Sequence, residues 1–144
     1  MTLTAPPEWP KPIQLSTGRH CLERYEHWVD TAFPTIAIEH LLSHRAQFID
    51  QLLQQLWQQC ALSDIDICLI AVGGYGRGSL FPQSDIDLLF LHAHPLSPKQ
   101  QQQIHQFVQL LWDLRLDVGH SVRTPAQCIE QATLDVTVAT SLLE

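Results

Sequence analysis

A glycine turn followed by two aspartates constrains the fold of this chain more than any other feature. An apolar run, residues 65–72, stops at Gly73 and Gly74, and after ten intervening residues Asp85 and Asp87 open a second apolar run. Apolar runs of this length, bounded by glycine and polar residues, are typical of buried strands. The order predicts strand, turn, strand.

The alternation in the second run determines where its side chains point. Because successive side chains of a strand alternate between faces, Asp85 and Asp87 share one face while Ile86 and Leu88 point into the core. Neighbouring carboxylates repel each other, and Mg²⁺ relieves that repulsion, since carboxylate and phosphate oxygens are its preferred ligands. The pair of aspartates predicts a magnesium site.

The turn itself predicts a phosphate site beside these carboxylates. Gly73 and Gly74 have no side chains, so backbone N–H groups can approach phosphate oxygens directly. Arg77 is the only cation of the turn and could bind a triphosphate bidentately, or pair with a nearby carboxylate. The hydroxyls of Ser79 and Ser84 could donate to phosphate or cap the turn. Together these residues predict a metal-nucleotide site.

These motifs at this spacing resemble the signature of the nucleotidyltransferase superfamily that includes DNA polymerase β. Residues 73–89, Gly-Gly-Tyr-Gly-Arg-Gly-x-Leu-x-Pro-x-Ser-Asp-Ile-Asp-Leu-Leu, are similar to one branch of it, the bifunctional uridylyltransferase/uridylyl-removing enzymes of the PII nitrogen-signalling protein. Residues 117–124 and 135–144 are also similar to that branch. The resemblance implies a polymerase-β-like α/β (α+β) fold, a small mixed sheet with packed helices and the site at one edge.

Asp117 is the candidate for the third acidic position that the superfamily carries on a neighbouring strand. Residues 114–122 are predicted to form that strand, and Asp117 lies between two apolar neighbours. In the resembled family such a carboxylate helps to hold a catalytic metal or deprotonates the attacking group. The alternative is an edge-strand aspartate that faces water, and Asp113 competes for the role. His120 is a weaker site candidate, because it belongs to the family-like run 117–124.

The resemblance also implies a reaction. Asp85 and Asp87 would hold Mg²⁺ together with the triphosphate of UTP, and a tyrosine hydroxyl of the PII protein would be activated at a second Mg²⁺ shared with Asp117. The hydroxyl would attack the α-phosphorus in line, and pyrophosphate would leave. Two alternatives stay open, namely a nucleotidyltransferase of the small-molecule or antitoxin type and a truncated module that binds nucleotide without turnover.

The remaining chain is predicted to form one domain. Residues 1–15 contain four prolines and are expected to form a flexible tail, and residues 16–144 are expected to form the nucleotidyltransferase domain. Amphipathic periodicity and capping residues predict helices at 16–30, 35–60 and 97–112 and from 124 onward. Residues 135–144 read as a further helix cut by the chain end. The HD-type hydrolase and the two ACT sensing modules of the resembled family are absent, so we expect no removal of UMP.

The charge of the chain disfavours one class of partner. A net charge of −7 with two lysines disfavours binding to a nucleic-acid backbone, although solubility alone could explain the acidity. A second Asp-x-Asp, formed by Asp64 and Asp66, lacks an upstream glycine pair and is expected to be a solvated strand start.

Cysteine spacing and hydropathy complete these expectations. The four cysteines form no Cys-x-x-Cys motif, which argues against a zinc cluster, and Cys60 and Cys68 are expected to be buried. The chain has neither a signal-like leader nor an 18-residue apolar span, so we expect a cytoplasmic location and no membrane contact.

Overall fold

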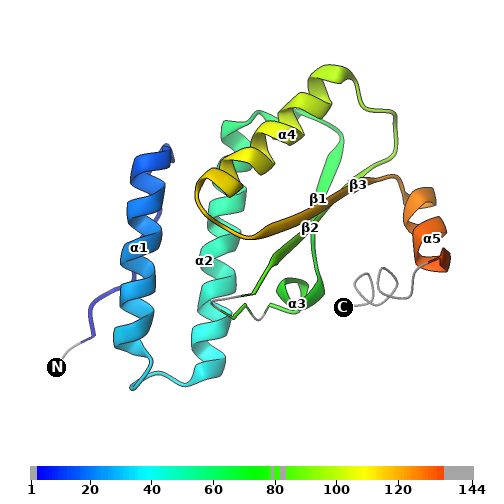
Figure 1. The fold of residues 1–144 in the computed structure, drawn as a ribbon. Helices are drawn as coiled ribbons and strands as arrows, with labels where there is room; N and C mark the ends of the chain where they lie inside the picture. Colours follow the sequence, from blue (N-terminus) through cyan, green and yellow to red (C-terminus); the bar gives the residue numbers. More distant parts are fainter. Residues whose placement is uncertain (1–2, 79, 82–83, 135–144) are drawn as a thin grey trace.

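The computed structural model is a mixed α/β fold (Figure 1) that describes residues 3–78, 80, 81 and 84–134. In chain order the elements are α1 (Leu15–Ala32), α2 (Ile38–Gln59), a short 3₁₀ helix η1 (Leu62–Asp64), β1 (Ile67–Val72), α3 (Gly73–Gly76), β2 (Ile86–His92), α4 (Pro98–Asp113), β3 (Val118–Arg123) and α5 (Pro125–Leu134). The predicted fold class, a small mixed sheet with packed helices, is confirmed.

The sheet has the strand order β1-β2-β3, with β2 in the centre. β1 and β2 are antiparallel and β2 and β3 are parallel, and helix α4 supplies the crossover that a parallel pair requires. The register places Asp87 of β2 opposite Val72 of β1 on one side and Gly119 of β3 on the other. These three residues therefore share one face of the sheet.

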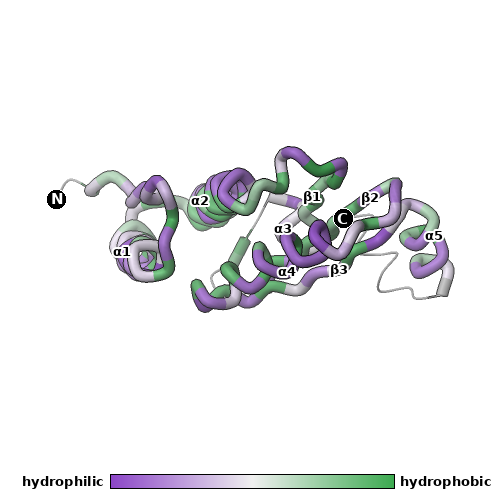
Figure 2. Tube along the Cα trace, turned by 90° about the horizontal axis from the view of Figure 1, so that it is seen from above, coloured by the Kyte–Doolittle hydropathy of each residue, from purple (hydrophilic) through white to green (hydrophobic). Residues whose placement is uncertain are grey.

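The helices occupy different positions around the sheet. Helices α1 and α2 lie beside each other on one side of the sheet and α5 lies at the far end (Figures 1 and 2). The tube in Figure 2 is green along most of β1 and β2, because both strands are predominantly apolar. Among the described residues, no helix is both long and apolar enough to cross a membrane.

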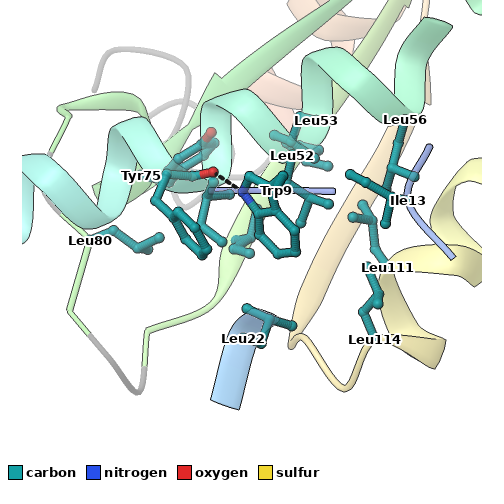
Figure 3. Close-up of a cluster of buried hydrophobic side chains, with 14 of the residues drawn as sticks. Trp9, Ile13, Leu22, Leu52, Leu53, Leu56, Tyr75, Leu80, Leu111 and Leu114 are labelled. Carbon is teal, nitrogen blue, oxygen red and sulfur yellow. Dashed lines mark hydrogen bonds between the residues drawn. The ribbon is translucent and has the colours of Figure 1, made fainter. Parts of the chain in front are cut away.

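The core lies where α1, α2 and α4 meet one face of the sheet, and Figure 3 shows part of it. Ile86 and Leu88 are 3% and 2% exposed, as the alternation of this strand predicts. Phe90 packs edge-on against Phe107 of α4, with ring centroids 5.9 Å apart. Four apolar residues of α4 that the periodicity places on one face are buried: Ile104, Phe107, Val108 and Leu111.

The N-terminal segment before α1 also contributes to this core. It forms neither helix nor strand, as its prolines predict, but Trp9 and Ile13 are only 6% and 7% exposed. The indole of Trp9 donates to the backbone oxygen of Phe48 at 2.8 Å, and Gln59 bonds both the N–H and the oxygen of Ile13. The described part of the predicted tail is thus anchored on α2.

Several predicted boundaries are corrected. The glycine turn is not an open loop, because residues 73–76 form the short helix α3. The third strand begins at Val118 instead of residue 114, since Arg115 adopts a left-handed φ of 67° and turns the chain out of α4. Helix α1 begins after Gln14 instead of Ser16 or Thr17.

Two other expectations have different outcomes. The predicted start of α4 is confirmed, because the Ser97 hydroxyl accepts the Gln100 N–H at 3.2 Å. Cys68 is exposed and not buried, because β1 is an edge strand and Cys68 lies on its outer face, whereas Cys60 is buried as expected.

Candidate functional site

The two aspartates lie at the start of the central strand. Asp85 directly precedes β2 and is exposed, and Asp87 is the second residue of β2 and is half-buried. The register puts Asp87 between Val72 and Gly119, on the face of the sheet opposite to the buried Leu88. The alternation of β2 thus directs both carboxylates away from the core, as the sequence predicts.

Glycines border both oxygens of the Asp87 carboxylate. Gly73 has a left-handed φ of +64°, and a Cβ added there would lie 2.9 Å from Oδ2 of Asp87. A Cβ added at Gly119 would lie 3.0 Å from Oδ1. A Cβ at Gly73 would be closer than real Cβ atoms come to another atom, and a Cβ at Gly119 would be closer than nine in ten such contacts, so either side chain would press on this carboxylate.

The sequence pattern predicts Gly73 as a site residue but not Gly119. A glycine inside a strand can mark the close approach of another group. Only the cross-strand register shows that this group is Asp87. Local sequence does not reveal which strand is the neighbour.

The electrostatics of the aspartate pair favour a cation. Partial burial raises the pKa of Asp87, and the negative charge of Asp85 raises that pKa further. Both effects disfavour the ionised form, and a bound cation would reverse them. The structure therefore brings these two carboxylates close enough to interact, as the sequence predicts.

The short helix α3 holds the other glycine of the motif. Gly74 is the second residue of α3, and a Cβ added there would lie 3.5 Å from Nη2 of Arg77, an ordinary contact. The exposed Arg77 caps α3, and its backbone N–H is directed at the oxygens of Gly74 and Tyr75. The arginine of the predicted phosphate site therefore extends over the glycine turn.

Tyr75 anchors this turn to helix α2, a role that the sequence pattern does not predict. Its side chain is 4% exposed, and its hydroxyl donates a short hydrogen bond to the Asp50 carboxylate. Burial raises the pKa of Tyr75, and the hydrogen bond and charge of Asp50 raise it further, so the hydroxyl stays protonated. A lone tyrosine between glycines gives no sequence signal for a partner 25 residues away.

The other predicted residues are less closely grouped. Asp117 is exposed and precedes β3, and its backbone oxygen accepts the N–H of Ile86 at 2.8 Å. Asp117 and Ser84 both line a cavity of about 380 Å³ bordered by Arg45. Ser79 lies outside the described residues. In the described part of the chain, no three His, Cys, Asp or Glu side chains gather as a metal site, and the role of Asp117 stays a prediction.

His120 lies on the opposite face from the aspartates. It is opposite Leu88, and its ring packs against Phe90 and the α4 residue Trp112, with centroids 6.1 and 5.8 Å apart. Burial lowers the pKa of His120, and the nearby His105 lowers it further. His120 is nevertheless exposed, at the rim of the core face of the sheet.

Comparison with known proteins places this geometry in a family. A family profile described as "Nucleotidyltransferase domain" matches residues 51–138, more than half of the chain. The bifunctional uridylyltransferase/uridylyl-removing enzyme of Idiomarina loihiensis is 49% identical over 85% of the chain and 14% of its own length. The enzyme of the same name from Pseudoalteromonas translucida is 49% identical over 91% of the chain and 15% of its own length. The enzyme of the same name from Photobacterium profundum is 44% identical over 99% of the chain and 17% of its own length.

The chain thus spans 14% to 17% of the length of these curated relatives. No solved structure matches it. The matched residues 51–138 contain the glycine turn, both aspartates of the central strand and Gly119. The chain therefore belongs to the nucleotidyltransferase domain family, as its motifs predict.

Proposed function

We propose that this chain transfers UMP from UTP to a tyrosine hydroxyl of the PII signalling protein and releases pyrophosphate. The observation that carries the proposal is the Asp87 carboxylate, which lies beside Asp85 and is bordered by Gly73 and Gly119. Uridylyl transfer is the first activity in the name of the relatives. The resemblance of the motifs supplies the PII acceptor.

Asp85 and Asp87 fit a hard divalent cation. They offer carboxylate oxygens on one face of the sheet, and partial burial and then the charge of Asp85 raise the pKa of Asp87, effects that a bound cation would counteract. We assign Mg²⁺ to this pair and keep Asp117 as the candidate ligand of a second ion. Bound Mg²⁺ would neutralise charge that develops on the phosphates during transfer.

The chain's own residues have separable tasks in this scheme. The bare backbone at Gly73 and Gly74 leaves room for phosphate oxygens, and Arg77, which lies over Gly74, would bind the triphosphate. Ser84 would donate its hydroxyl to a phosphate oxygen, and Ser79 is proposed for the same task. The tyrosine hydroxyl would then attack the α-phosphorus opposite the departing pyrophosphate.

The removal of UMP, the second activity in the relatives' name, is not assigned to this chain.

The test is the intact mass of PII after incubation with the chain, Mg²⁺ and one of the four common nucleoside triphosphates. We expect a UMP-sized mass gain with UTP only and its loss in Asp85→Asn/Asp87→Asn. The control Asp30→Asn/Glu39→Gln removes the same two charges from exposed positions of α1 and α2 and should keep the activity.

Other outcomes favour the alternatives. A mass gain with another nucleotide, or with another acceptor only, would assign a different nucleotidyltransferase. Nucleotide binding in calorimetry without any mass gain would favour a module that binds without turnover.

A further inference from the structure

The outer edge of β1 carries a row of backbone groups that no strand of the described residues pairs with. β1 pairs with β2 along one edge, and no strand of the described part of the chain pairs with its other edge. Native proteins shield such edges with charged residues, proline or bulges. β1 reads Ile-Cys-Leu-Ile-Ala-Val and has none of these, and Cys68, Ile70 and Ala71 are exposed. The edge is therefore suited to pair with another extended segment.

An apolar cavity lies directly beside this edge, between β1 and α2. Its volume is about 390 Å³, and Tyr75 and Asp50 lie at its wall. The apolar residues that line it include Leu53, Trp57, Ile67, Leu69 and Leu88. An extended peptide paired with β1 would direct every second side chain to this face of the sheet. The cavity would receive a large apolar side chain of that peptide.

The opposite face of the same edge leads to the aspartate pair. β1 ends at Val72, which is directly opposite Asp87 in the register. A strand added to β1 would lie two strand spacings from β2, about 10 Å from the Cα of Asp87. Side chains project out of a sheet, so a tyrosine placed next to Val72 on this face would stand on the same side of the sheet as the Asp87 carboxylate, two strand spacings away.

Charge at the other end of β1 restricts the partner further. Asp64 and Asp66, the second Asp-x-Asp of the sequence, are both exposed immediately before the strand. The chain carries a net charge of −7. A segment that runs along the whole of β1 would therefore be favoured by a lysine or arginine near this end.

We propose that the open edge of β1 binds an extended segment of the acceptor protein as a fourth strand. Its tyrosine lies next to Val72 on the face of Asp87, a neighbouring apolar side chain enters the cavity beside α2, and a basic side chain lies near Asp64 and Asp66. This assignment deepens the proposed function and rests on it for the identity of the acceptor.

Hydrogen exchange of the chain with PII, with and without UTP, tests the pairing directly. We expect the amides of residues 67–72 that face outward to exchange at least ~10-fold more slowly when PII is saturating. Protection confined to other segments, or no protection, would overturn the proposal. Protection that grows with chain concentration in the absence of PII would assign the edge to a second copy and overturn it as well.

Backbone chemistry gives a sharper readout. In peptides that span the acceptor tyrosine, N-methylation of alternate amides should abolish competition with PII, and methylation shifted by one residue should not, because only every second amide faces β1. Equal effects at all positions would exclude strand addition.

Charge reversal separates this inference from the proposed function. Asp64→Lys/Asp66→Lys should raise the KM for PII roughly tenfold and leave UTP affinity unchanged. Asp30→Lys/Glu39→Lys makes the same charge change on α1 and α2 and should leave both constants unchanged. If UTP fails to bind the unmodified chain, the proposed function fails, while β1 protection by PII still decides the docking site. If transfer proceeds and Asp64→Lys/Asp66→Lys behaves like its control, the basic contact of the docking inference fails and the proposed function stands.

Discussion

The close approach of Gly73 to Asp87 gives a prediction in which backbone strain and site geometry can be separated. Gly73 and Gly78 both have left-handed φ, +64° and +77°. A non-glycine residue in that region costs about 1–2 kcal/mol, so alanine should destabilise the chain by a similar amount at both positions. For a domain of this size, that loss lowers the Tm by roughly 3–8 °C.

Only one of the two alanines would disturb the site. At Gly73 the new Cβ would lie 2.9 Å from Oδ2 of Asp87, whereas ordinary contacts begin at 3.4 Å, so the atoms must separate by about 0.5 Å. At Gly78 no atom of the described residues, its chain neighbours aside, lies within 4 Å of the new Cβ. Because misplacement of a reacting group by 1 Å can cost about 100-fold in rate, we expect Gly73→Ala to lower kcat about 10-fold and Gly78→Ala less than 2-fold.

The assay is uridylylation of PII at saturating UTP, with the Tm of each variant measured beside it. Equal losses of kcat in both variants would mean that backbone strain, and not the position of Asp87, limits the activity. A fully active Gly73→Ala variant with a lowered Tm would refute the assignment of Asp87 to the reacting centre.

Three further predictions use neighbouring contacts. Gly119→Ala puts a Cβ 3.0 Å from Oδ1 of Asp87, so kcat should fall. Because Gly119 has no left-handed φ, the free energy of unfolding, measured with urea, should rise by about 0.5–1 kcal/mol. A loss of both kcat and stability would contradict this prediction. Because the pKa of Asp87 is raised in the folded chain, its contribution to stability is complete below the ordinary value of 3.8 and is lost as pH rises through the raised pKa. Asp87→Asn should therefore raise the Tm at pH 7 without Mg²⁺, and this gain should vanish near pH 3. Tyr75→Phe removes the hydrogen bond to Asp50 and should cost about 1 kcal/mol and weaken UTP binding in calorimetry, whereas Tyr25→Phe removes a 2.7 Å bond to His44 and should lower stability alone.

The helices were predictable because their signals are local. Apolar residues three and four apart identify α2 and α4, and the Ser97-Pro98 pair marks the start of α4. The boundaries that failed depend on distant contacts instead. The third strand starts late because the chain leaves α4 through a left-handed Arg115, a conformation that nothing in the local sequence requires.

The site, like the helices, was predictable where its signals are local. The strand period places Asp85 and Asp87 on one face, and the end of an apolar run beside two glycines predicts the turn. Gly119 and Asp50 were missed because each meets the site through tertiary contacts, across β2 and from α2 respectively. His120 was kept as a candidate because of its motif, and the register of β3 directs it to the opposite face.

The register between β2 and β3 thus determines the site, although contacts away from the Asp87 carboxylate fix it. A shift of one residue would replace Gly119 by His120 opposite Asp87, because side chains alternate between faces. Two hydrogen bonds hold the first residues of β3 in place, the N–H of Ile86 to the Asp117 oxygen at 2.8 Å and the Trp112 indole to the Val118 oxygen at 3.0 Å. On the core face, Leu88 is buried, and a shift of register would turn it toward solvent and lose this burial. The carboxylate therefore meets a glycine because packing on the other face permits only this alignment.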